Sequence, residues 1–169
     1  PVAAAIDRIL GTPSGGLFVS GWLLDPLDRV DQVILRSTRR LNVPLQDSWH
    51  RAERPDLNKA FATDPRFAGL LDPRVRLHGF SCAVFAEPDD LDGAALYLEV
   101  VLKEWSGFFL PCEITPCDGD SSAHPVLEAL HSHDPALKTW ISNHAAPFIA
   151  TVPDRPINRS RITGQPLAD

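Results

Sequence analysis

One stretch of the chain, residues 15–26, constrains the fold more than any other. A Gly-Gly pair opens it, and Asp25-Pro26 ends it because proline has no amide hydrogen and restricts the residue before it. A strand with apolar side chains on both faces, as this one has, belongs at the centre of a sheet that is covered on both faces. Gly21 indicates a close approach of another backbone or a bulge. The apolar side chains fall on both sides of the pleat: Leu17, Val19 and Leu23 on one, Phe18, Trp22 and Leu24 on the other.

Six further stretches predict strands. Residues 94–103 are the clearest, because every second residue from Leu96 to Leu102 is aliphatic, which is the period of a strand with one buried face. Short turns join the strands, so we expect antiparallel pairing. About seven strands at this spacing predict a mainly β fold, an antiparallel β-sandwich of the immunoglobulin-like or jelly-roll-like kind. The other five expected strands are residues 3–10, 30–37, 41–45, 79–86 and 108–115.

The pattern changes at Arg54-Pro55-Asp56. Proline suits the first position of a helix, aspartate favours its positive end, and the apolar residues that follow repeat at helical spacing. We therefore expect one short inserted helix that ends before Asp64-Pro65, and then a loop over residues 66–76. An acidic turn is expected over 88–93.

Beyond the strands the chain divides into three expected parts. Residues 1–116 form the β-sandwich domain, residues 117–151 a helical C-terminal extension, and residues 152–169 an extended linker rich in proline and arginine. In the extension, one helix is expected from Pro125. A second follows Asp134-Pro135, and its apolar stripe comprises Leu137, Trp140, Ile141, His144 and Phe148.

Composition excludes some classes of function. A net charge of −6 argues against nucleic acid, whose phosphates attract a basic face. No segment approaches the roughly 20 apolar residues that span a bilayer. Three cysteines are too few for a disulfide framework, which favours buried thiols and a reducing, cytoplasmic compartment, although a Cys112–Cys117 bridge is an alternative. Without methionine and opening on Pro1, the chain reads as a piece of a longer polypeptide.

Five short motifs occur in a specific order. They are Gly-x-x-x-x-Gly-Trp-x-x-Asp-Pro (16–26), Val-x-x-Val (30–33), Trp-x-Arg (49–51), Arg-Pro-Asp (54–56) and Gly-Phe (79–80). This order resembles a β-rich N-terminal accessory module of large bacterial glycosyltransferases of the GT-A class, over about residues 3–115. The resemblance implies a non-catalytic domain followed by a nucleotide-sugar-using catalytic domain. No nucleotide-binding α/β pattern appears here, so the transferase chemistry would lie outside this chain.

Aromatic side chains are the main candidates for carbohydrate binding, because the C–H face of a sugar ring stacks on an aromatic face. Trp105 and Tyr97 are the leading residues, with Glu99 and Lys103 beside Tyr97 on the expected outward face. Trp49 is a third candidate. The alternative for Trp49 is a structural role, in which its side chain packs under the inserted helix. Trp22 is expected in the core.

Arg51, Arg54 and Asp56 form a compact charged group after Trp49. The planar fork of arginine binds carboxylate or phosphate through two hydrogen bonds, so the two arginines are candidates for a sugar or anion site. The alternative is an internal ion pair that fixes the corner between strand and helix.

No metal or cofactor site is expected. His131-x-His133 and His144 have the wrong spacing for one helical face, and the acidic run at 87–92 lacks the order of a calcium loop. The resemblance to the accessory module implies a non-catalytic domain that binds glycan or positions the catalytic domain. One alternative is an interaction domain whose C-terminal helical stripe docks on a neighbouring domain or forms a homodimer. An independent hydrolase is another, although no serine has the context of a nucleophile elbow.

Overall fold

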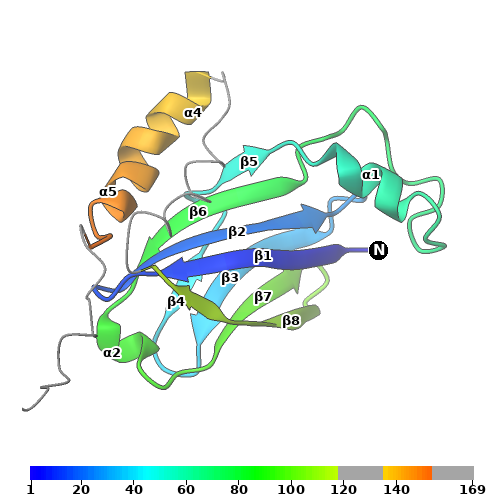
Figure 1. The fold of residues 1–169 in the computed structure, drawn as a ribbon. Coiled ribbons are helices and arrows are strands. Elements are labelled where there is room, and N and C mark those ends of the chain that lie inside the picture. The colour runs from blue at the N-terminus through cyan, green and yellow to red at the C-terminus, as the bar shows by residue number, and fades with distance from the viewer. Residues whose placement is uncertain (118–134, 154–169) are drawn as a thin grey trace, which may run out of the picture.

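The computed structural model describes residues 1–117 and 135–153. In this part of the chain, nine strands form two stacked sheets, which confirms the predicted mainly β sandwich (Figure 1). The strands are β1 (Ala3–Gly11), β2 (Gly16–Leu24), β3 (Val30–Ser37), β4 (Asn42–Pro44), β5 (His50–Ala52), β6 (Gly79–Phe85), β7 (Leu96–Leu102), β8 (Gly107–Cys112) and β9 (Ile114–Pro116). The helices are α1 (Pro55–Phe61), α2 (Pro88–Leu91), α4 (Pro135–Trp140), η2 (Ile141–Ala145) and α5 (Ala146–Ile149).

The two sheets differ in size and order. The five-stranded sheet has the order β5-β6-β2-β1-β9, and the four-stranded sheet has the order β4-β3-β7-β8. The pairs between neighbouring strands are antiparallel, except that β9 runs parallel to β1. Short connections join the pairs β1-β2, β3-β4 and β7-β8, whereas β2-β6 and β3-β7 pair strands that lie far apart in the chain.

The central place predicted for β2 is confirmed. It pairs with β1 on one side and β6 on the other, and its two apolar faces enter different clusters. Both features that Gly21 indicated, a close backbone approach and a bulge, are present. A Cβ atom there would lie 2.4 Å from the carbonyl oxygen of Ala5, and the opposite strand β1 has a bulge between Ile6 and Arg8. A larger residue at position 21 would therefore push β1 away.

The main core lies between the sheets. In β2, β6 and β7 every second residue turns inward, which is the alternation seen in the sequence, whereas register shifts interrupt this alternation in β1 and β3. The predicted inward residues of β6 and β7 are confirmed, and those of β8 are half-buried against the same core. The buried members include Leu17, Val19, Leu35, Phe80, Cys82, Val84, Leu98 and Val100.

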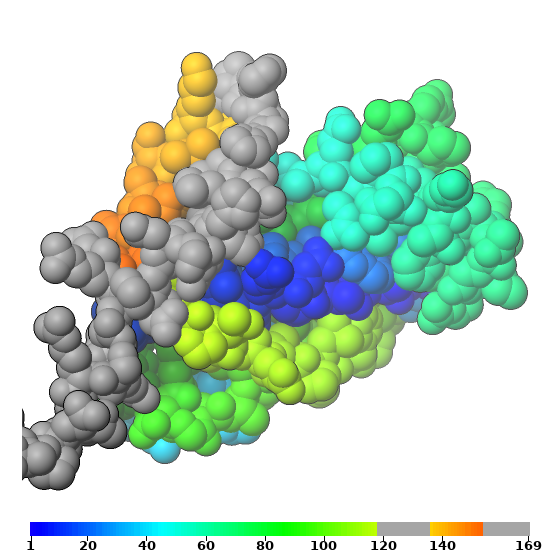
Figure 2. Space-filling model, viewed as in Figure 1, coloured from blue at the N-terminus to red at the C-terminus, as the bar shows by residue number. Residues whose placement is uncertain are grey.

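The outer face of the five-stranded sheet is covered in two places. The helical segment, residues 135–149, packs over Phe18 near the start of β2, through Leu137, Trp140 and Phe148. Helix α1 and the loop after it pack over Trp22 near the end of β2, with Phe61 at 5.5 Å between ring centroids. In Figure 2 these two coverings, orange and cyan to green, lie over opposite ends of the sheet.

Some expectations about individual elements are wrong. Residues 108–115 were expected to form one strand, but the chain leaves the four-stranded sheet after Cys112 and enters the other sheet as β9. Ile114 therefore pairs with Ile9 of β1 and does not share the face of Phe108. The expected acidic turn contains a second short helix, α2. Trp22, rather than Trp49, packs against α1.

The inserted helix agrees with its prediction. Pro55 stands in the first turn with Asp56, and the helix ends at Phe61, before Asp64-Pro65. The predicted stripe of the helical segment is also present, but it is buried against the chain's own sheet. That stripe is thus not free to dock on a second copy. The expected helix from Pro125 and the linker from residue 154 onward lie outside the described residues.

Candidate functional site

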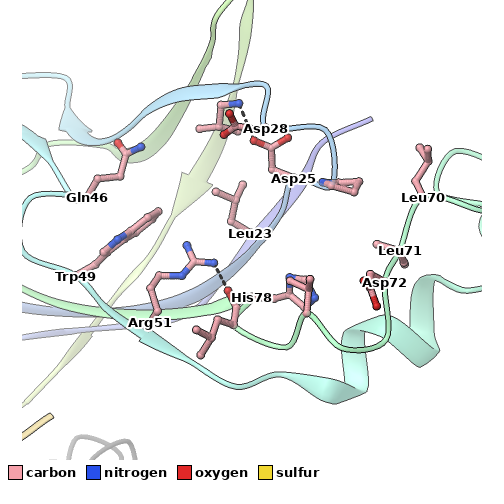
Figure 3. A pocket seen from close by; sticks show the side chains of 14 residues that line it. Leu23, Asp25, Asp28, Gln46, Trp49, Arg51, Leu70, Leu71, Asp72 and His78 are labelled. Atoms are coloured by element: carbon pink, nitrogen blue, oxygen red, sulfur yellow. Dashed lines mark hydrogen bonds between the residues drawn. The ribbon is translucent and has the colours of Figure 1, made fainter. Parts of the chain in front are cut away.

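A cleft of about 460 Å³ opens at the end of the sandwich where β2 ends and β3 begins (Figure 3). Three segments form its walls: the turn at 25–30, the stretch at 46–51 that leads into β5, and the loop at 70–78 that leads into β6. The volume falls within the range of about 300–1,000 Å³ that is usual for small-molecule sites. The wall is mixed, with leucines and valines beside Trp49, Arg51, His78 and three aspartates.

Trp49 and Arg51 form one side of the cleft. The Trp49 ring lies 5.4 Å from the ring of Phe80, which belongs to the main core, and the guanidinium carbon of Arg51 lies 4.5 Å from the Trp49 centroid. Arg51 also donates a hydrogen bond from Nη2 to the carbonyl of Leu77 (Figure 3). These contacts fix the plane of the guanidinium, so the group is held before any ligand arrives.

Arg51 has no acidic partner among residues 1–117 and 135–153. Burial lowers the pKa of its guanidinium. Arginine nevertheless stays protonated at neutral pH, because its ordinary pKa is above about 12. The cleft therefore contains a half-buried positive charge that no carboxylate of the described chain neutralises.

The three aspartates of the cleft are all engaged. Asp25 accepts hydrogen bonds from the backbone N–H groups of Arg29 at 2.9 Å and Val30 at 2.7 Å, which fixes the turn between β2 and β3. Asp28 accepts from Nζ of Lys103 at 2.6 Å.

Asp72 is the third of these aspartates. It accepts from the Arg74 side chain at 2.7 Å and 3.0 Å and from the Arg74 backbone N–H at 2.9 Å. These hydrogen bonds lower the pKa of Asp72 to about 2. Asp72 is therefore a carboxylate throughout the physiological range, and its charge is balanced by Arg74.

His78 closes the back of the cleft. The residue is buried, and its Nε2 lies 3.1 Å from Oδ1 of Asn58 on α1. Burial, with a smaller effect of the positive Arg51, lowers the pKa of the imidazole. A neutral His78 thus joins the 70–78 loop to α1, and Asn58 strengthens the link by donating to the carbonyl of Val75 at 2.8 Å.

Arg54 lies outside the cleft and forms the predicted internal ion pair. Its side chain donates to Asp56 at 2.9 Å and to Asp7 of β1 at 2.8 Å. Gly79 makes room for it, since a Cβ atom there would lie 2.9 Å from Cγ of Arg54. The structure therefore separates the two arginines of the charged group, and Arg54 fixes the corner between β5 and α1.

Tyr97 and Glu99 lie on the outer face of the four-stranded sheet, away from the cleft. Tyr97 makes an edge-to-face contact with Phe109 at 5.5 Å between centroids, and Glu99 pairs with Arg36 on the neighbouring strand. Phe109 is mostly exposed. The alternation of β8 could have identified Phe109, because its neighbour Phe108 points inward.

Lys103 and Trp105 follow the end of β7. Lys103 leaves the strand and pairs with Asp28, so it borders the turn at the cleft rather than standing beside Tyr97. Trp105 is 97% exposed and has a positive φ of 61°. The residues predicted to bind carbohydrate therefore lie in four separate places. These are the cleft (Trp49, Arg51), the corner between β5 and α1 (Arg54), the outer face of the four-stranded sheet (Tyr97, Glu99) and the turn after β7 (Lys103, Trp105).

Within the part of the chain that the structure describes, no group of three or more His, Cys, Asp or Glu residues could hold a metal ion. The acidic residues Asp89 and Asp90 of α2 line a second hollow, of about 500 Å³, with Arg39 and Arg40. His131 and His133 lie outside the described residues. Cys82, Cys112 and Cys117 are thiols, and burial raises the pKa of Cys82 and of Cys112.

Compared with known proteins, the chain matches no family model, no curated protein and no solved structure. None of the helices among residues 1–117 and 135–153 has the length and apolar character needed to cross a membrane.

Proposed function

We propose that the chain is a non-catalytic accessory domain of a bacterial glycosyltransferase, and that it binds carbohydrate in the cleft at the end of the sandwich. One observation carries the proposal: residues from separate sequence motifs line one cavity. Asp25 and Pro26 come from the first motif and Trp49 and Arg51 from the third, while His78 directly precedes Gly79-Phe80. The catalytic domain would lie outside this chain.

The chemistry of the wall suits a sugar. The Trp49 edge and the side chains of Leu23 and Leu77 offer apolar surface to the C–H groups of a pyranose ring. Each carboxylate oxygen of Asp25 has accepted one backbone hydrogen bond and keeps a lone pair for a hydroxyl group. Gln46 is already oriented, because its Oε1 accepts from the Val33 N–H at 2.7 Å and its Nε2 donates to the Asp31 carbonyl.

The charge state of Asp72 does not suit acid catalysis. A general acid for glycoside hydrolysis needs a carboxyl group with a raised pKa, whereas the pKa of Asp72 is lowered to about 2. Three cysteines in the thiol form also fit the reducing cytoplasm in which such a transferase would work.

A binding experiment tests the proposal directly. The purified chain is screened on a glycan array, and a bound saccharide is then titrated by calorimetry. Trp49→Phe should weaken binding about three- to tenfold, because the smaller ring keeps the contact with Phe80 but loses surface in the cleft.

Trp105→Ala and Tyr97→Ala are the matched controls, since both change an aromatic residue outside the cleft. They should leave the affinity unchanged. Absence of binding to any saccharide by the folded chain would contradict the proposed function. Loss of binding in Tyr97→Ala with no change in Trp49→Phe would contradict its location.

A second role, contact with the following catalytic domain, is favoured by the exposure of Trp105. A 97% exposed tryptophan in a turn with positive φ offers a large apolar side chain to a partner surface. In the two-domain protein, the tryptophan emission of Trp105 should shift to the blue. The difference between wild type and Trp105→Ala isolates that signal, and an unchanged emission would exclude this surface.

A further inference from the structure

We propose that the sugar bound in the cleft is acidic, a hexuronate whose carboxylate is held by Arg51. This inference rests on the proposed function and adds the chemical class of the ligand. It follows from the state of Arg51, which differs from that of the other arginines around the cleft.

Arg51 is a prepared binding group with unused capacity. A guanidinium has five N–H donors in a planar fork. Its Nη2 donates to the Leu77 carbonyl, while Nε and Nη1 have no acceptor among the described residues. Stacking on Trp49 at 4.5 Å fixes the plane of the fork. A carboxylate can therefore take the remaining donors in the paired geometry that arginine favours.

The neighbouring arginines show the contrast. Arg29 pairs with Glu104, Arg74 with Asp72, and Arg54 with both Asp56 and Asp7. Arg51 alone among these four has no carboxylate partner within residues 1–117 and 135–153, although it is the one on the cleft wall. A half-buried charge without a partner is costly, and a bound anion would remove that cost.

The aspartates around the cleft do not oppose an anion as three free charges would. Asp28 is balanced by Lys103 and Asp72 by Arg74, and the Asp25 carboxylate faces two backbone N–H groups. Their remaining lone pairs accept hydrogen bonds from sugar hydroxyl groups. An aliphatic acid offers no such donors, so the mixture of one guanidinium with several acceptors favours a uronate.

The test compares ligands that differ only in charge. Tetrauronates of galacturonate, mannuronate and glucuronate are titrated by calorimetry against their methyl esters, which keep the ring and lose the negative charge. At least one acid should bind about 10- to 100-fold more tightly than its ester, the range expected for hydrogen bonds to a charged group. The preference should shrink as ionic strength rises.

Variants assign this preference to one residue. Arg51→Gln should remove the preference for acid over ester, and Arg51→Lys should restore part of it because it returns the charge without the fork. Arg76→Gln is the matched control, since it removes an exposed arginine of the loop at 70–78 that does not line the cleft. Circular dichroism confirms that each variant is folded.

The outcomes separate the two proposals. Equal binding of acids and esters, or an unchanged preference in Arg51→Gln, overturns the acidic-sugar inference and leaves carbohydrate binding in place. Displacement of the uronate by inorganic phosphate at equal concentration also overturns it, because the cleft would then be a general oxyanion site. If no neutral or acidic saccharide binds, both proposals fail.

Discussion

The outer faces of the two sheets differ in what covers them. On the five-stranded sheet, β2 turns Phe18, Trp22 and Leu24 outward, and the helical segment and α1 bury them. On the four-stranded sheet, the outward residues of β7 are Tyr97, Glu99 and Val101; Tyr97 contacts the mostly exposed Phe109 and Glu99 pairs with Arg36 of the same sheet. A sheet with one polar face can stand against water, whereas a sheet with two apolar faces requires a third layer.

This difference also explains the position of the cleft. The covered sheet needs the long excursion between β5 and β6, which contains α1 and the loop at 70–78. That excursion covers Trp22 and Leu24 and supplies one wall of the cleft. In the four-stranded sheet, short turns join β3 to β4 and β7 to β8, and Arg39 and Arg40 of the first turn line a different hollow with Asp89 and Asp90. The need to bury one more apolar face has thus created the place for a ligand.

The largest expected effect comes from removing an anchor of the third layer. Phe148→Ala should lower the free energy of unfolding by about 3–5 kcal/mol, as for other buried phenylalanines. Phe148 is fully buried and lies 5.7 Å from Phe18 between ring centroids. Urea denaturation measures the loss. A loss below about 1 kcal/mol would mean that the helical segment does not cover the sheet in solution.

A smaller effect is expected where the same segment meets the wall of the cleft. Nε1 of Trp140 donates to the carbonyl of Ser48 at 2.7 Å, next to Trp49. Trp140→Phe keeps a ring at this position but leaves the carbonyl without its donor, which should cost about 1–2 kcal/mol. Urea denaturation gives the value. The variant should also weaken glycan binding slightly, and stability equal to wild type would show that this hydrogen bond does not hold the segment.

On the uncovered sheet, Phe109→Ala should change the free energy of unfolding by no more than about 0.5 kcal/mol, the usual range for surface positions. Phe109 is 62% exposed and contacts Tyr97 by its edge. Phe148→Ala is the matched comparison, because both variants remove one phenyl ring from an outer face. A loss above about 2 kcal/mol would mean that a further layer covers this sheet as well.

The smallest effect belongs to an ion pair at the edge of the cleft. Arg74 lowers the pKa of Asp72 to about 2, below the ordinary value of 3.8. Because the folded pKa is depressed, the pair's contribution is complete above pH 3.8 and is lost as the pH falls toward 2. NMR titration of the Asp72 carboxyl group should show a midpoint near 2 in the wild type. In Arg74→Gln it should return toward 3.8, and equal midpoints would contradict the pairing.

Several features of the fold follow from local sequence because their physical cause is local. The two-sided alternation of β2 predicts its central place, and Pro55 with Asp56 predicts where α1 begins. The strand at 108–115 is different. Its alternation continues past Cys112 to Ile114, although the chain changes sheets between them. A period of two does not record which sheet a residue faces, so this break is invisible in the sequence.

The candidate site also has features that follow from local sequence and features that depend on distant contacts. Trp49 and Arg51 are two residues apart in the chain, and both line the cleft. The sequence alone did not separate Arg51 from Arg54, because the partners that distinguish them, Leu77 and Asp7, come from distant parts of the chain. No sequence pattern identified His78, because its partner Asn58 also lies far from it in the chain.

By itself the sequence determined the sandwich, its central strand and the start of the inserted helix, because hydrophobic period and backbone chemistry act between near neighbours. Only the tertiary structure decided that the stripe of the helical segment is buried within the chain, that Arg54 fixes a corner, and that Arg51 lies in a cleft with no carboxylate partner among the described residues. Those outcomes depend on contacts between residues far apart in the chain, and burial or charge pairing across such distances is set by how the layers stack.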